Sequence, residues 1–201
     1  MAGNFATLPI IDIGALIKGV PGRLSVADQI ARACRESGFF YIAGHGIDDH
    51  LQQRLEELSR TFFAWSLGEK LDIRMERGGS AWRGYFPVGG ELTSGKPDLK
   101  EGLYFGAELD RDHPLVRSGT PMHGANLFPK DIAFFRETVL EYMGLAGEVE
   151  VRLGRCETDP WVVRLQHRGY ARPNDRRALS LHAAPRPQSF PSRPAVFSVF
   201  L

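Results

Sequence analysis

The chain contains few cysteines. Only Cys34 and Cys156 occur among its 201 residues, and they lie far apart in the sequence. Two such cysteines form neither a disulfide framework nor a cysteine-rich zinc site, and sparse cysteine is typical of proteins in a reducing compartment. We therefore expect a cytoplasmic protein.

The sequence also lacks long apolar runs and an excess of charge of one sign. No apolar segment approaches the roughly 20 residues that span a bilayer, and the first residues do not combine a basic region with an apolar signal core. The formal net charge is +1 with 24% charged residues, so no global field attracts nucleic acid or acidic lipid. These absences predict a protein with neither a nucleic-acid nor a membrane partner.

Motifs for nucleotide binding and for nucleophilic catalysis are missing as well. The segments GVPGRLS and GGSAWRGY have neither the lysine of a P-loop nor the spacing G-x-G-x-x-G. Cys34 lies on the apolar side of an expected helix, which favours a small buried hydrophobe over a nucleophile.

Hydrophobic residues make up 43% of the chain, enough for one compact domain with a core. Three segments place apolar residues at helical spacing behind a residue that favours a helix start. The expected helices cover residues 25–38, 48–68 and 129–147. They begin with a Ser25–Asp28 capping box, with Asp48 as a cap and with Pro129 as the first helical residue.

Apolar and β-branched segments predict strands. LPIIDI, GFFYIA and KEGLYFGAEL have this composition, and glycines around GFFYIA indicate a buried strand followed by a tight turn. Between Gly78 and Pro97, glycines with isolated aromatic residues predict loops and irregular edge strands. Helix followed by strand indicates an α/β arrangement in this part of the chain.

The composition changes near residue 150. Residues 151–201 contain nine arginines, no lysine, three acidic residues and six prolines. Proline interrupts helices and central strands, so only 161–165 and 195–201 are expected to be strands. Binding of RNA by the arginines is one interpretation. A poorly ordered tail is favoured, because such sequence buries too little apolar area to offset its ordering entropy.

Five segments in order resemble the N-terminal region of isopenicillin N synthase-like oxygenases. They are LPIIDI, ACRESGFFYIAGHGI, FFAWSLGEK, RGYFPVGGE and DLKEGLYFGAEL, and a weaker similarity is DPWVVRLQH. The resemblance implies an α+β fold, in which an N-terminal α/β region packs around an incomplete double-stranded β-helix (jelly roll) flanked by helices. It also implies a dioxygenase-type region at 1–147 and a truncated Arg/Pro-rich remnant of the oxygenase core at 148–201. Trp65, Ser66 and Gly68 depart from the family pattern, which we interpret as surface variation.

Members of this family are non-haem enzymes that use Fe(II) and 2-oxoglutarate to oxidise a small molecule with oxygen. Two histidines and one carboxylate hold the iron on one side and leave positions open for cosubstrate, oxygen and substrate. In family sequences these ligands are a His-X-Asp pair and a distant histidine. An Arg-X-Ser beyond them binds the far carboxylate of 2-oxoglutarate.

No histidine of this chain has an acidic residue two positions later. The residues at that position are Ile47, Gln52, Leu115, Ala125, Gly169 and Ala184. The resemblance places the pair after Leu165, where His182 has no partner carboxylate nearby. We therefore expect no metal ligands here, no binding of Fe(II) or 2-oxoglutarate by this chain, and an inactive product of a truncated or frame-disrupted gene.

The resemblance also suggests residues beside the substrate pocket. Arg83, Tyr85 and Phe86 belong to the segment that approaches the pocket in the family, although core packing of the aromatic residues is an alternative. The family's D-x-K-E corresponds to a loop beside the active-site mouth, where simple solvation of the charged groups is the alternative. Its residues here are Asp98, Lys100 and Glu101. His45 is assigned to a turn rather than to a metal site.

Two hypotheses for function follow. The first is an oxidoreductase-family protein whose parent reaction is the oxidation of a small molecule by 2-oxoglutarate, oxygen and Fe(II). The second is a non-catalytic fragment that acts as a binding or scaffold module. The substrate, the reaction outcome and the oligomeric state are not indicated by the sequence.

Overall fold

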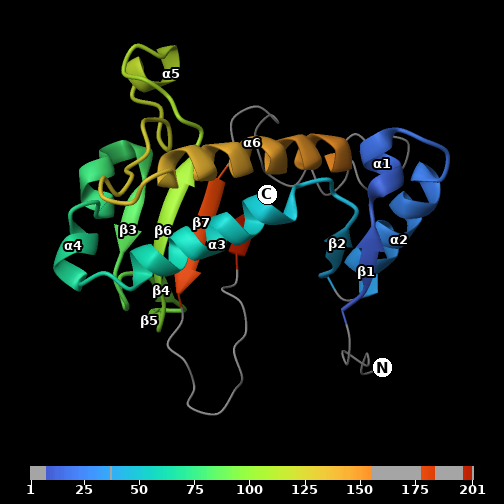
Figure 1. Cartoon of the computed structure of the whole chain (residues 1–201), viewed down its shortest axis with the longest axis horizontal. Coiled ribbons are helices and arrows are strands. Elements are labelled where there is room, and N and C mark those ends of the chain that lie inside the picture. The colour runs from blue at the N-terminus through green and yellow to red at the C-terminus, as the bar shows by residue number, and fades with distance from the viewer. Residues whose placement is uncertain (1–7, 37, 155–177, 184–196, 201) are drawn as a thin grey trace. The chain divides into compact units, whose positions relative to one another are not determined.

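A computed structural model describes residues 8–36, 38–154, 178–183 and 197–200. Helices and strands are both distributed along the chain (Figure 1). In order they are β1 (Ile10–Asp12), α1 (Gly14–Lys18), α2 (Arg23–Glu36), β2 (Tyr41–Ala43), α3 (Asp49–Phe63), α4 (Leu67–Leu71), the 3₁₀ helix η1 (Met75–Ala81), β3 (Gly84–Phe86), β4 (Leu92–Thr93), β5 (Lys96–Pro97), β6 (Glu101–Gly106), α5 (Pro114–Arg117), α6 (Phe135–Gly154), β7 (Ala178–Ala183) and β8 (Phe197–Phe200). None of the described helices has the length and apolar character needed to cross a membrane.

The described residues form two compact units. The first contains the described residues up to Asp48 together with those from Leu145 to Gly154, and the second contains those from Asp49 to Gly144 together with β7 and β8. Helix α6 contributes its first half to the second unit and its last half to the first. The fold is therefore a mixture of helix and strand in which one helix belongs to both units.

The first unit is built on a parallel pair of strands. β1 pairs with β2, and Ile11 lies opposite Ile42. One face of this pair packs against apolar side chains of α1, α2 and the end of α6. The buried members of this core are Ile11, Ile13, Leu16, Val26, Ala33 and Val149.

Two tight turns close the ends of this strand pair. The Gly14 N–H donates to Asp12 Oδ1 over 2.8 Å, which turns the chain from β1 into α1. After β2, Gly44 and Gly46 both have positive φ, and the Ile47 N–H donates to Nδ1 of His45. The expected turn at His45 is thus confirmed, and its imidazole accepts a backbone hydrogen bond.

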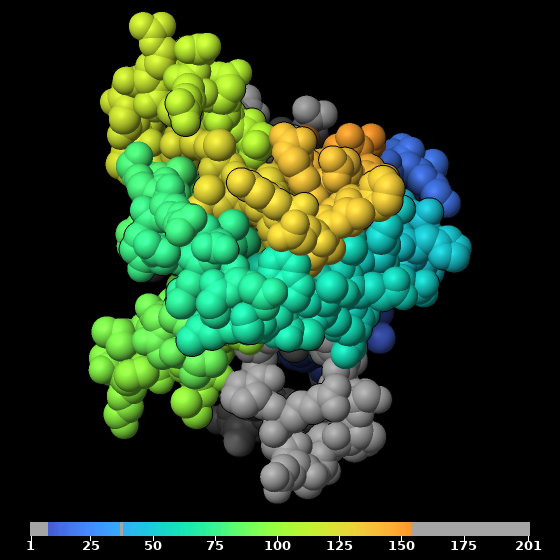
Figure 2. Space-filling model, turned by 60° about the vertical axis from the view of Figure 1, so that its left-hand side comes forward, coloured from blue at the N-terminus to red at the C-terminus, as the bar shows by residue number. Residues whose placement is uncertain are grey.

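The second unit is built on an antiparallel sheet. Its strand order is β3-β6-β7-β8 within the described residues. Helices α3 and α6 lie side by side over this unit (Figures 1 and 2). Arg54 of α3 links them, because its guanidinium donates to Thr138 and to Glu141 of α6. Aromatic side chains fill the core, and Phe62 contacts both Tyr85 and Phe135.

The three expected helices are present, and α3 begins directly after the expected cap Asp48, but the other two starts differ from the predictions. The capping box at Ser25 is wrong, because α2 already begins at Arg23 and the Ser25 carbonyl accepts from the side chain of Gln29. A capping box does occur at Ser66, whose hydroxyl and backbone N–H both engage Glu69. The start at Pro129 is also wrong, because α6 begins only after Phe134, whose φ is positive.

The expected strands are also present, with one correction. LPIIDI, GFFYIA and KEGLYFGAEL contain β1, β2 and β6, and 195–201 contains β8. The prediction that GFFYIA is a buried strand is wrong, because Tyr41 in β2 is 63% exposed. Residues 161–165 lie outside the described residues, and β7 was not expected. The described strands form no closed barrel.

The turn after β2 provides a stability test. Gly44 has φ +68°, and a Cβ there would lie 2.2 Å from Asp12 Oδ1. We expect Gly44→Ala to lower the free energy of unfolding by about 2–4 kcal/mol, because it adds a clash to left-handed backbone strain. Gly19→Ala is the control, because Gly19 has φ +65° and open space around it. In urea unfolding, Gly19→Ala should lower the free energy of unfolding by only about 1 kcal/mol. Equal losses for the two variants would contradict the role of the Asp12 contact.

Candidate functional site

All six candidates from the sequence lie in the strand pair β3–β6 or close to it in the sequence. Tyr85, Phe86 and Glu101 belong to the strands, and Arg83, Asp98 and Lys100 precede them. In the register of this pair, Tyr85 lies opposite Leu103 and Phe86 lies opposite Gly102. Successive side chains of a strand point to opposite faces, so Tyr85 and Phe86 belong to different faces. Tyr85 and Leu103 are in the core beneath the helices, and we name their face the covered face.

A buried ionic network lies at the edge of the covered face. The Lys70 ammonium, from α4, is 2.7 Å from Glu101 Oε2, and the Tyr85 hydroxyl donates to the same oxygen over 2.5 Å. Lys70 is only 7% exposed and also donates to the Phe63 carbonyl. Burial of Tyr85 raises the pKa of its phenol well above the usual range, and the Glu101 carboxylate raises that pKa further. This network joins α4, β3 and β6.

Arg83 is buried directly before β3. Its guanidinium donates to the carbonyls of Ala81 and Met122, both over 2.8 Å. Gly106 leaves room for it, because a Cβ there would lie 1.9 Å from Arg83 Nη2. Burial lowers the pKa of Arg83, and the charge of Glu108 acts in the opposite direction. The structure thus places this guanidinium against the carbonyl at the end of η1 and against a carbonyl of the loop that follows α5.

The opposite face of β3–β6 carries a group of aromatic and charged side chains. The rings of Phe86 and Tyr104 are 4.9 Å apart, and the Tyr104 hydroxyl donates to Glu91. The Lys100 ammonium lies 3.2 Å from Glu91 Oε2 and 3.5 Å from Asp98 Oδ2. We name these five residues the hairpin cluster. It combines the half-buried ring of Tyr104, packed on the buried Phe86, with two carboxylates and one ammonium. Such groups orient small molecules in binding sites.

The loop between β3 and β6 holds this cluster together. β4 and β5 pair through a two-residue turn at Ser94 and Gly95, which both have positive φ, as hairpin turns of this length require. Backbone hydrogen bonds join Gly89 to Asp98 and Asp98 to Glu91. This hairpin protrudes as a lobe in the space-filling view (Figure 2). Two acidic residues and the lysine are thereby fixed beside the sheet.

The six candidates divide between two environments. Arg83, Tyr85 and Glu101 take part in buried contacts that join secondary structure elements. Phe86, Asp98 and Lys100 belong to the hairpin cluster. Sequence reasoning missed three residues that complete these groups, Lys70, Glu91 and Tyr104. The alternation in EGLYFG could have indicated Tyr104, but Lys70 and Glu91 join only through the tertiary fold.

The described residues do not fit an iron site of two histidines and one carboxylate. Within these residues, no three His, Cys, Asp or Glu side chains gather closely enough to hold a metal ion. His45 and His113 each accept a hydrogen bond from a backbone N–H two residues later. His182, in β7, is paired in register with Gly102, and the residue two positions later in the sequence is Ala184.

Comparison with known sequences gives consistent matches. The family model described as non-haem dioxygenase in morphine synthesis N-terminal matches residues 8–131. A probable iron/ascorbate oxidoreductase of Dictyostelium discoideum is 51% identical over 146 residues, which is 68% of this chain and 40% of that protein. The homoarginine-6-hydroxylase 2-ODD-C23 of Glycine max is 33% identical over 77% of this chain and 49% of its own length. The chain spans about half the length of the curated relatives it matches.

Solved structures show the same fold. Full-length Neurospora crassa T7H in complex with alpha-KG and thymine superposes with a TM-score of 0.61 at 20% identity, over 87% of this chain and 54% of T7H. A putative 2OG-Fe(II) oxygenase family protein from Caulobacter crescentus gives a TM-score of 0.61 at 18% identity, over 91% of this chain and 58% of that protein.

The buried network at Glu101 can be tested by mutation. Lys70→Met leaves the Glu101 carboxylate without its cation, so we expect the free energy of unfolding to fall by about 3 kcal/mol. The double variant Lys70→Met/Glu101→Gln should lose less than the sum of the two single losses. Arg60→Met breaks the exposed Arg60–Glu56 pair and serves as the control, with an expected change within about 0.5 kcal/mol. If urea unfolding gave Lys70→Met and Arg60→Met the same loss of unfolding free energy, the buried Lys70–Glu101 pair would not have the stabilising role assigned to it.

Proposed function

Since the chain belongs to the non-haem Fe(II)- and 2-oxoglutarate-dependent dioxygenase family, as its N-terminal region, we propose that it forms the substrate-side portion of an oxygenase acting on a small molecule. The match over residues 8–131 is the observation that carries this proposal. It is supported by relatives such as the homoarginine-6-hydroxylase and by the thymine complex of T7H, whose names indicate small-molecule substrates.

The four-stranded sheet of the second unit is proposed to be part of a jelly roll. Its strands are antiparallel, and helices cover one face of β3–β6, as in a sheet flanked by helices. An incomplete jelly roll would leave the other face toward the substrate. Under this proposal residues 1–147 are the dioxygenase-type region and 148–201 a remnant of the oxygenase core.

The hairpin cluster is the proposed substrate-side surface. Tyr104 offers an aromatic ring that packs on the buried Phe86, and Glu91, Asp98 and Lys100 offer hydrogen-bonding and charged groups beside it. Such a combination can orient a polar small molecule by stacking and by ion pairing. Arg83, Tyr85 and Glu101 would hold the strands that carry this surface in place. They would do so through the buried hydrogen bonds and the ion pair described above.

The chain alone is proposed not to bind Fe(II) or 2-oxoglutarate productively. Iron in this family needs two imidazoles and one carboxylate around it. No histidine of the 201 residues is followed by an acid two positions later. The described carboxylates of Glu101 and Glu108 are occupied by Lys70 and by Asn126 and Arg136. Because these carboxylates make contacts within the fold, a non-catalytic role for this chain by itself is consistent with the structure.

An anaerobic titration tests this proposal. The purified chain is mixed with Fe(II) and 2-oxoglutarate, and the metal-to-ligand absorption band is followed before oxygen is admitted and succinate is measured. We expect neither signal from this chain, because its donor set does not fit the metal. Full-length T7H, which has been crystallised with alpha-KG, is the positive control. A band or succinate from this chain would show that it holds an iron site and is active.

A further inference from the structure

The charges of the hairpin cluster do not balance. The cluster contains two carboxylates, those of Glu91 and Asp98, and one ammonium, that of Lys100. The ammonium contacts both carboxylates, at 3.2 Å from Glu91 Oε2 and at 3.5 Å from Asp98 Oδ2. On the covered face, by contrast, Lys70 and Glu101 form a pair of one cation and one anion. One negative charge of the hairpin cluster therefore has no counter-charge within the cluster, and it attracts a positive ligand.

The groups of the cluster that would bind an anion are already engaged. The Lys100 ammonium contacts the two carboxylates and also lies over the ring of Phe86, 6.0 Å from the ring centre. The Tyr104 hydroxyl donates its proton to Glu91 Oε1. An anionic ligand would have to displace Glu91 or Asp98 from these groups, and it would meet the repulsion of both carboxylates.

The groups that suit a cation are less fully used. Asp98 contacts Lys100 through Oδ2, and among the described residues no donor is paired with its Oδ1. Its side chain is 23% exposed, so a small ligand reaches it while screening by solvent is reduced. Tyr104 is half-buried in the same cluster, and the face of a phenol ring attracts cations. A carboxylate beside an aromatic ring is a combination that binds organic cations.

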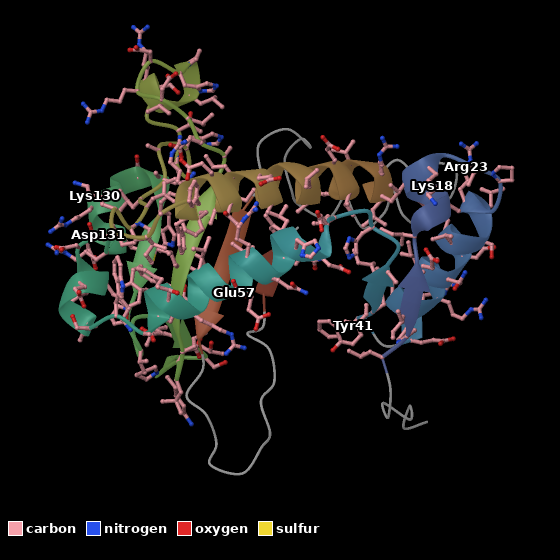
Figure 3. All side chains as sticks on the ribbon, in the orientation of Figure 1. Lys18, Arg23, Tyr41, Glu57, Lys130 and Asp131 are labelled. Atoms are coloured by element: carbon pink, nitrogen blue, oxygen red, sulfur yellow. The ribbon has the colours of Figure 1, made fainter. Side chains whose placement is uncertain are left out.

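The backbone of the hairpin fixes the position of the Asp98 carboxylate. The Asp98 N–H donates to the Glu91 carbonyl, and the Asp98 carbonyl accepts from the Gly89 N–H. The side chains of β3, β6 and the hairpin gather in one region of the second unit (Figure 3). The place of Asp98 therefore depends on backbone pairing as well as on its contact with Lys100.

We propose that the hairpin cluster binds a small organic cation, an amine or a guanidinium, in preference to an anion. This inference rests on the proposed function, because it takes the cluster as the substrate-side surface. The cation pairs with Asp98 and lies against the ring of Tyr104. A metal ion is a poorer occupant, because within the described part of the chain no three metal-binding side chains gather. A guanidinium is weakly hydrated and stacks on aromatic rings, which suits this site.

An NMR titration of the whole 201-residue chain with benzylammonium and with phenylacetate tests this inference. The two probes share an aromatic ring and differ in the sign of their charge. We expect benzylammonium to shift the amide signals of Gly89, Glu91, Asp98 and Tyr104, and to bind at least about fivefold more tightly than phenylacetate. Equal affinities, tighter binding of phenylacetate, or no shift of these signals by either probe overturns the inference.

Three variants locate the effect within the cluster. Asp98→Asn removes the charge of the acceptor and should weaken benzylammonium binding about fivefold. Lys100→Met removes the competing ammonium and should strengthen that binding about threefold, which a purely structural role of Lys100 does not predict. Lys96→Met is the matched control, because it removes the same charge from β5, where exposed Lys96 forms no ion pair with any described residue.

The comparison of the two lysine variants decides between a local and a general effect of charge. Lys96→Met should change the affinity for benzylammonium less than Lys100→Met does. Equal effects of the two variants, or weaker binding by Lys100→Met in a chain whose other signals are unchanged, overturn the inference. These outcomes are independent of the iron band and succinate, which test the proposed function.

Discussion

The carboxylate of Glu101 is the constraint on which the second unit depends. It is largely buried and accepts from both the Lys70 ammonium and the Tyr85 hydroxyl. A buried charge without such partners costs several kcal/mol, so α4 and β3 must both meet β6 at this point. That meeting fixes the register of β3 against β6. The register in turn puts Phe86 and Tyr104 on the opposite face, where the hairpin cluster forms.

The regular elements were predictable because they depend on local pattern. The apolar stripe of α3 and the β-branched run of β1 identify their elements without tertiary information. Helix starts were less predictable, because several Ser and Asp residues satisfy the same capping rule. Ser25 fits a capping box as well as Ser66 does, but only Ser66 stands at an observed helix start. The exposure of Tyr41 was missed because apolar composition alone does not say which side of a strand is covered.

The candidate site was only partly predictable from the sequence. The family pattern indicated Phe86, Asp98 and Lys100 as candidates beside the substrate pocket. It indicated Tyr85 and Glu101 in the same way, although these two belong to the buried network. Their different environments follow from the two-residue period of a strand, which assigns neighbours to opposite faces. Lys70 is 31 positions from Glu101 in the sequence, so no local motif joins them. Contacts of this kind need the tertiary fold, and these contacts separate supporting residues from those of the hairpin cluster.

Several polar groups of the described residues hold the structure of the chain itself. His45 and His113 accept backbone hydrogen bonds in turns, Asp12 closes the turn after β1, and Glu101 and Arg83 join neighbouring elements. A metal ligand needs a lone pair that is free and held in a fixed geometry with two others. In the described residues these groups instead serve turns and ion pairs of the fold. Family membership therefore identifies the architecture of this region, and the side chains named here serve that architecture.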